Sequence, residues 1–105
     1  MGYMSHHAIL VTSWKGEHIE EAHEKARELF NKMVSEISPE VINHYRSFAI
    51  FPDGSKEGWL ESEQGDELRE RFISWLKEAN LYLSWVEVQY GDEENNNLVL
   101  HYSGE

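Results

Sequence analysis

The chain has 105 residues, of which 40 % are hydrophobic and 28 % are charged, so it is long enough for one folded domain and too apolar to be disordered. It contains no cysteine, which excludes disulfides, a thiol nucleophile and a zinc knuckle. No apolar run approaches the ~20 residues that span a bilayer, and the N-terminus lacks the basic-then-apolar order of a signal peptide. We therefore expect a single domain over residues 1–105, located in the cytoplasm and without a membrane partner.

The formal net charge is −11, and the isoelectric point is about 4.9. Binding to nucleic acid relies on Lys and Arg that neutralise phosphates, so this balance argues against a direct nucleic-acid partner. It leaves open a protein partner with a basic face, for which an acidic chain would act as a DNA mimic. The simpler interpretation is that the acidity serves solubility.

The first half of the chain predicts a strand, a helix and a second strand. Residues 6–14 contain the run Ala8-Ile9-Leu10-Val11, which is typical of a central strand buried on both faces. Over 17–33, apolar residues spaced three and four apart predict an amphipathic helix. Residues 42–51 alternate imperfectly, which predicts a strand that ends at the turn Pro52-Asp53-Gly54.

The second half predicts a helix and a hairpin. Ser62 or Asp66 could cap the start of the helix, and Asn80 lies near its end. The apolar residues at helical spacing are Leu68, Phe72, Trp75, Leu76 and Ala79. In 82–90, Val86, Val88 and Tyr90 alternate with Trp85, Glu87 and Gln89, and a polar loop leads to a last strand over 98–103. The order β-α-β-α-β-β predicts an α/β (α+β) fold with a mixed sheet and two amphipathic helices.

No motif in the chain supports catalysis or metal binding. The six histidines include no H-E-x-x-H pair, and His101-Tyr102-Ser103 matches the H-x-[ST] element of two-histidine phosphoesterases without a second copy. A triad of Ser13, His44 and Asp53 lacks any nucleophile-elbow sequence. We therefore predict no catalytic residues, no metal ligands and no cofactor.

The distribution of charge is the most informative feature. Residues 1–16 contain no acid and one lysine, Lys15, while residues 41–56 contain Arg46 and Lys56 against Asp53 alone. The two segments together carry +3 − 1 = +2, which leaves −11 − 2 = −13 for the other residues. Buried strands exclude carboxylates, but this does not explain why a lysine follows each strand.

A ligand site follows if the first two strands are parallel. Their carboxyl ends would then share one edge of the sheet, where strand-to-helix loops present backbone N–H groups to a ligand. Glycines there allow close approach, lysines add positive charge, and tryptophans offer a stacking face; Arg46 joins them unless it pairs with a helix carboxylate. The predicted ligand-binding residues are Ser13, Trp14, Lys15, Gly16, Arg46, Asp53, Gly54, Ser55, Lys56 and Trp59.

We also expect a homo-oligomer, most simply a dimer. Four tryptophans and five tyrosines are many for this length, and several lie outside the helix stripes, notably Trp85 and Tyr102. Aromatic residues that a small core does not accommodate suit an interface. The competing interpretation is a monomer with aromatic-lined pockets.

The combination "HHAILVTSW…YRSFAIFPDGSKEGW…WVEVQYGD" resembles small acidic proteins encoded by bacteriophages. Such proteins include antagonists of host defence, some of which sequester nucleotide signals while others block host proteins. The resemblance implies a location in the host cytoplasm and an anti-defence role, and it assigns no residue to a site.

Two classes of function are therefore expected. The first is a non-catalytic binding protein for a small anionic, nucleotide-like ligand, such as a host signal that a phage protein sequesters. The second is an acidic inhibitor that blocks a basic surface of a host protein, through Glu63, Asp66, Glu67 and Glu70 or through Asp92, Glu93 and Glu94. An uncharacterised small enzyme comes third, because no coherent set of catalytic groups is present. If Lys15 and Lys56 lie far apart, the second class takes first place.

Overall fold

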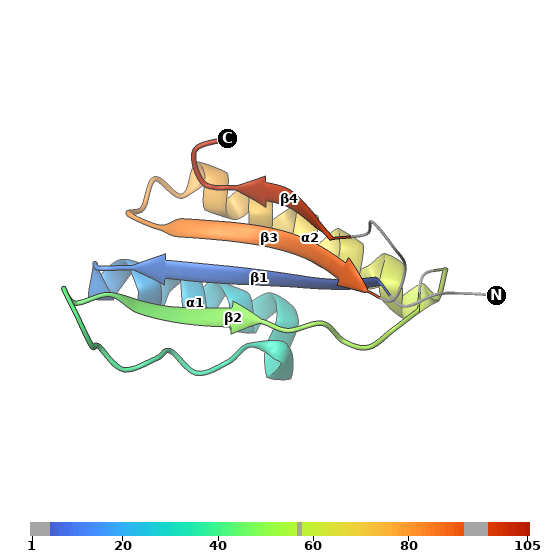
Figure 1. Ribbon diagram of the computed structural model, residues 1–105, viewed down its shortest axis with the longest axis horizontal. Helices are drawn as coiled ribbons and strands as arrows, with labels where there is room; N and C mark the ends of the chain where they lie inside the picture. Colours follow the sequence, from blue (N-terminus) through green and yellow to red (C-terminus); the bar gives the residue numbers. More distant parts are fainter. Residues whose placement is uncertain (1–4, 57, 92–96) are drawn as a thin grey trace.

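The computed structural model describes residues 5–56, 58–91 and 97–105 and has the predicted β-α-β-α-β-β order (Figure 1). Both helices lie behind one face of a four-stranded sheet, so the protein is a two-layer α+β domain. Within the described residues, neither helix is long and apolar enough to cross a membrane. The elements are β1 (Ser5–Ser13), α1 (Gly16–Phe30), the 3-10 helix η1 (Asn31–Met33), β2 (Arg46–Ile50), α2 (Leu60–Glu78), β3 (Ser84–Gly91) and β4 (Leu98–Tyr102).

All neighbouring strands are antiparallel, and their order is β2-β1-β3-β4. The first strand is central, as predicted, with Ile9 opposite Ile50 on one side and Glu87 on the other. Two predictions are wrong: the first two strands are not parallel, and the sheet is not mixed. β2 and β3 do run in the same direction, but β1 lies between them.

The antiparallel pairing arises from the chain between α1 and β2, which the sequence did not identify as extended. Residues 34–38 run along the outer side of β2, where the backbone N–H of Ser35 donates to Ala49 O (2.8 Å) and that of Ser38 donates to Ser47 O (2.8 Å). This 34–38 segment carries the chain to the far end of the sheet before β2 begins. Asn43 and His44 then turn the chain back, with φ of 55° and 67°, so the strand starts at residue 46 rather than 42.

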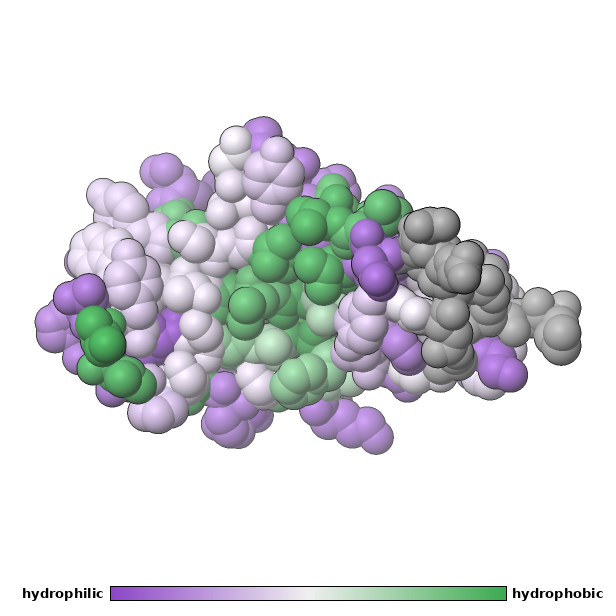
Figure 2. Space-filling model, in the orientation of Figure 1, coloured by the Kyte–Doolittle hydropathy of each residue, from purple (hydrophilic) through white to green (hydrophobic). Residues whose placement is uncertain are grey.

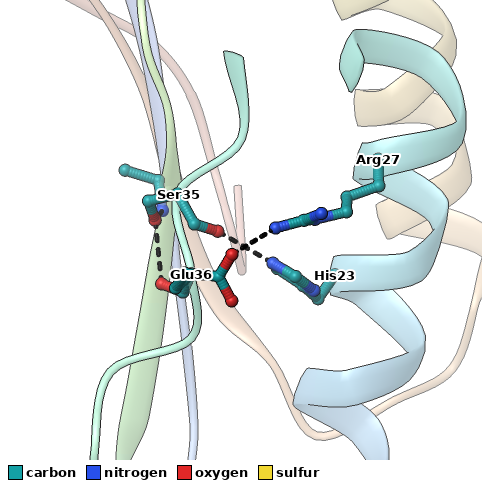
Figure 3. A network of polar contacts seen from close by, with 5 residues as sticks. His23, Arg27, Ser35 and Glu36 are labelled. Carbon is teal, nitrogen blue, oxygen red and sulfur yellow. Dashed lines mark hydrogen bonds and ion pairs between the residues drawn. The ribbon is translucent and has the colours of Figure 1, made fainter. Parts of the chain in front are cut away.

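Polar contacts hold the 34–38 segment between α1 and β2 (Figure 3). The Nε2 atom of His23 lies 2.8 Å from the backbone oxygen of Ser35, and Arg27 Nη2 donates to Glu36 Oε1 at 2.6 Å. On the other side, the Ser35 hydroxyl accepts the backbone N–H of Ala49 (2.8 Å). The helix, the segment and the edge strand are therefore tied together by both backbone and side-chain groups.

The core lies between the helices and the covered face of the sheet, and it confirms the predicted helix stripes. Phe72 is fully buried, with its ring against Phe30 (5.9 Å, edge to face) and stacked on Trp75 (6.0 Å). α2 begins at Leu60, earlier than either predicted cap, and left-handed Asn80 follows its end. The buried apolar residues are Ile9, Val11, Ile19, Ala22, Ala26, Phe30, Val34, Phe48, Ile50, Phe72, Ile73, Leu76 and Trp85.

The prediction that β1 is buried on both faces is wrong. Leu10 is 49 % exposed because both helices pack on the face occupied by Ile9 and Val11. Trp85 on β3 was expected outside the core, as part of an interface. Its side chain is instead buried, at 7 % exposure, and belongs to the core. Trp85 therefore provides no argument for an interface.

Truncation of Phe72 should be strongly destabilising. Phe72→Ala removes a fully buried ring and leaves a cavity, which costs about 3–5 kcal/mol in the free energy of unfolding. Val41→Ala is the control, because Val41 is 81 % exposed and its truncation should change stability by less than about 0.5 kcal/mol. Urea denaturation measures both, and similar losses in the two variants would contradict this description of the core.

Candidate functional site

The antiparallel sheet divides the predicted ligand site into two halves. Ser13 lies opposite Arg46, so residues 13–16 are at the end of the sheet where β2 begins. Residues 53–59 follow the other end of β2 (Figure 1). The two lysines are separated by at least the length of β2, roughly 16 Å for five residues. Lys15 and Lys56 therefore do not flank one anion.

In the first half, local hydrogen bonds and packing occupy the side chains. The Ser13 hydroxyl donates to Tyr82 O and accepts the backbone N–H of Lys15 (3.0 Å). Trp14 lies against the ring of Tyr82, at 5.5 Å between centroids. Arg46 Nη1 is 3.7 Å from Glu20 Oε1, so the alternative of pairing with a helix carboxylate is confirmed. Gly16 is the first residue of α1.

In the second half, the residues form the turn that leads into α2. Asp53 Oδ1 accepts the backbone N–H (2.9 Å) and the hydroxyl (2.6 Å) of Ser55, which is an Asx turn. Gly54 has φ of 82°, a conformation that favours glycine. The Lys56 carbonyl accepts the N–H of Trp59 (3.2 Å), the N-cap residue of the helix. This stretch is primarily a turn.

Asp53 also reaches a charged cluster that the sequence did not predict. Arg69 projects from α2, its side chain only 13 % exposed, and donates to Asp66 one turn earlier. Its Nε lies 3.7 Å from Glu87 Oε2 on β3. A Cβ atom on Gly65 would lie 3.0 Å from Arg69 Nη1 and 3.6 Å from Asp53 Oδ2. Gly65 thus makes room for the guanidinium of Arg69.

Burial perturbs the ionisation of the groups around Arg69. It raises the pKa of Glu87, which lies on the covered face, and Arg69 offsets only part of that shift. Burial, and then Arg69, lower the pKa of His7 on β1. Partial burial acts to raise the pKa of Asp53, but the hydrogen bonds from Ser55 and the charge of Arg69 outweigh it and hold that pKa below its usual value.

A cavity of about 510 Å³ opens between α2 and the strands beside this cluster, within the size range of small-molecule sites. Its two permanent cations are already paired with carboxylates: Arg69 as described, and Lys77 with Glu105 Oε1 at 3.0 Å. His101 Nδ1 lies 2.9 Å from the same oxygen. Two of the lining carboxylates, Asp66 and Glu87, are the partners of Arg69, and the lining also includes Glu70 and the imidazole of His7. Across the described part of the chain, no group of three His, Asp or Glu is arranged to hold a metal ion.

Sequence reasoning missed Arg69, Glu87 and His7 because they come from three different elements. One feature pointed to the cluster: Glu87 lies two residues after Trp85 and so on the same face of the strand, and burial of the tryptophan therefore places the carboxylate on the covered face. Of the proposed acidic contacts, Asp66 and Glu70 line the cavity. Asp92, Glu93 and Glu94 lie outside the described residues.

Three comparisons with known proteins gave no match: the chain fits no protein-family model, and no curated protein and no solved structure is significantly similar to it.

The raised pKa of Glu87 predicts how stability depends on pH. The folded protein holds a proton on Glu87 more tightly than the unfolded chain, whose glutamates titrate near about 4.3. The resulting stabilisation is fully present below that pH and is lost as pH rises through the raised pKa. Glutamine stays neutral, so Glu87→Gln should gain stability relative to the wild type between about pH 5 and about pH 8.

Urea denaturation across that pH range measures the difference between the two proteins. Glu24→Gln, at an exposed position of α1, is the matched control and should follow the wild-type curve. A difference between Glu87→Gln and the wild type that stays constant with pH would contradict the assignment.

Proposed function

We propose that this protein is a non-catalytic binding protein that occupies a basic surface of another protein. The contact is made through the acidic face of α2, which consists of Glu63, Asp66, Glu67 and Glu70. This was the second of the two expected classes, and the separation of Lys15 from Lys56 moves it to first place. The observation that carries it is the cavity beside α2, where both permanent cations are neutralised by carboxylates within the protein.

The helix layer supports this proposal with its charge. α1 carries five carboxylates against two cations and α2 carries six against three, so the two helices contribute −3 and −3. All eleven carboxylates belong to exposed residues. Surface charges of one sign attract an oppositely charged partner and raise its association rate.

The cavity supplies a more specific element than surface charge. A lysine or arginine side chain from the partner fits a space of about 510 Å³ whose rim holds Asp66 and Glu70. The cavity is also lined by Glu87, and burial raises the pKa of its carboxyl group. A cation inserted there would reverse that effect, because an adjacent positive charge favours the carboxylate. The partner's cation and Glu87 would therefore stabilise each other.

The small anionic ligand loses its geometric basis, because its ten predicted residues do not converge. The cavity is no better suited to an anion, because the lining carboxylates Asp66, Glu70 and Glu87 outnumber the cations Arg69 and Lys77, which are already paired. The resemblance to bacteriophage proteins that block host proteins is compatible with the preferred class. A host protein is accordingly the proposed partner.

Charge neutralisation on α2 should weaken binding of a basic probe. A tetra-arginine peptide, titrated by calorimetry at low salt, is small enough to place one guanidinium in the cavity. Glu67→Gln combined with Glu70→Gln removes two exposed charges, each worth roughly 0.2–1 kcal/mol, so affinity should fall about twofold to thirtyfold. Binding to the wild type should also weaken steeply as NaCl is added.

The matched control is Glu21→Gln combined with Glu24→Gln, which removes the same charge from exposed positions of α1. Equal losses in the two double variants would mean that only net charge matters and that α2 holds no site. A panel of mono-, di- and cyclic nucleotides is titrated in parallel, and binding there would restore the small anionic ligand to first place.

A further inference from the structure

The face of the sheet turned away from the helices has an apolar patch at its centre, which neither helix covers (Figure 2). Strand register assigns twelve described residues to this open face: Ser47 and Ala49 from β2, His6, Ala8, Leu10 and Thr12 from β1, Ser84, Val86, Val88 and Tyr90 from β3, and Val99 and Tyr102 from β4. Among them Leu10, Tyr90, Val99 and Tyr102 are 41–60 % exposed.

None of these twelve residues is Asp, Glu, Lys or Arg. In a chain that is 28 % charged, twelve surface positions would carry about three charges if charge were evenly spread. Antiparallel sheets with one solvated face normally alternate apolar inward with polar outward. Here the valines of β3 point outward and Glu87 points inward, so eight of the twelve positions on the open face are apolar or aromatic and none is charged.

We infer that a second copy of this chain covers the open face, with two sheets packed face to face about a two-fold axis. Each copy carries a net charge of −11, so two copies repel each other least when they meet on a surface free of carboxylates. The open face is such a surface. A two-fold axis brings the same patch of each copy together, and an apolar patch without charges is complementary to itself.

The size of the open face fits this occupant. Four strands spaced ~4.8 Å apart, with five to nine residues at ~3.3 Å each, cover roughly 400 Å² in projection. Side chains that project from it increase the accessible area toward the roughly 800 Å² that each partner buries in a standard interface. Two such faces would stack about 10 Å apart, as in a β-sandwich.

This interface does not involve the acidic face of α2, which lies on the other side of the sheet (Figure 1). A dimer would present two copies of that acidic face, pointing in opposite directions. The inference therefore stands or falls independently of the proposed function.

Light scattering at micromolar concentration tests the inference directly. The wild type should have a mass of 2 × 12.3 = 24.6 kDa, and Leu10→Asp, which places a charge in the middle of the open face, should shift it to 12.3 kDa. The dimer dissociation constant should rise at least about hundredfold, because a buried unpaired charge is costly. Val41→Asp adds the same charge at an exposed site off the sheet and should leave the dimer intact.

Two further measurements guard against a variant that does not fold. Tyr102→Ser, at the margin of the open face, should weaken the dimer while the circular dichroism spectrum stays native. The thermal midpoint of the wild type should rise with protein concentration. A 12.3 kDa wild-type species, or a dimer that Leu10→Asp leaves intact, would overturn the inference, including the case in which a different protein covers this face.

Discussion

The pairing of β1 with a strand on each side determines where the rest of the protein lies. Alternate residues of a strand project to opposite faces, so Ile9 and Val11 enter the core while Leu10 is left outside. Both helices pack on the face that holds Ile9 and Val11. The covered face consequently receives the core, the Arg69 cluster and the cavity, and neither helix covers the open face.

The register of β3 shows how this constraint distributes polar and apolar groups. A shift of one residue would bring Val86 and Val88 inside and expose Glu87, but it would also expose Trp85. An indole ring contributes 150–250 Å² of buried surface, on the order of 4–6 kcal/mol. Burial of the Glu87 carboxylate costs free energy and so opposes the observed register. The guanidinium of Arg69, 3.7 Å from Glu87, offsets part of this desolvation cost. Burial of Trp85 therefore favours the observed register, and Glu87 lies on the covered face because it is two residues away on the same strand.

The sequence predicted those parts of the fold that depend on local spacing. The stripe from Ile19 to Phe30, the apolar residues of α2 and the order of elements were correct because they follow from residues three or four apart. The strand direction was wrong because it depends on the 34–38 segment and on two left-handed residues that follow it. Similarly, the site around Arg69 joins residues from β1, α2 and β3, and no local pattern contains all of them. Six of the ten predicted ligand residues proved to be turn or cap residues: Lys15, Asp53, Gly54, Ser55, Lys56 and Trp59.

The 34–38 segment has a consequence for how the sheet can be extended. It occupies the outer hydrogen-bonding groups of β2, so an incoming strand finds no free template at that side. β4 forms the opposite edge, and no described strand pairs with its outer side. Strand addition is thus possible in one direction only. In two chains joined through β4, both outer edges would be β2 strands already paired with the 34–38 segment, so strand addition onto β2 would not extend the sheet into a filament.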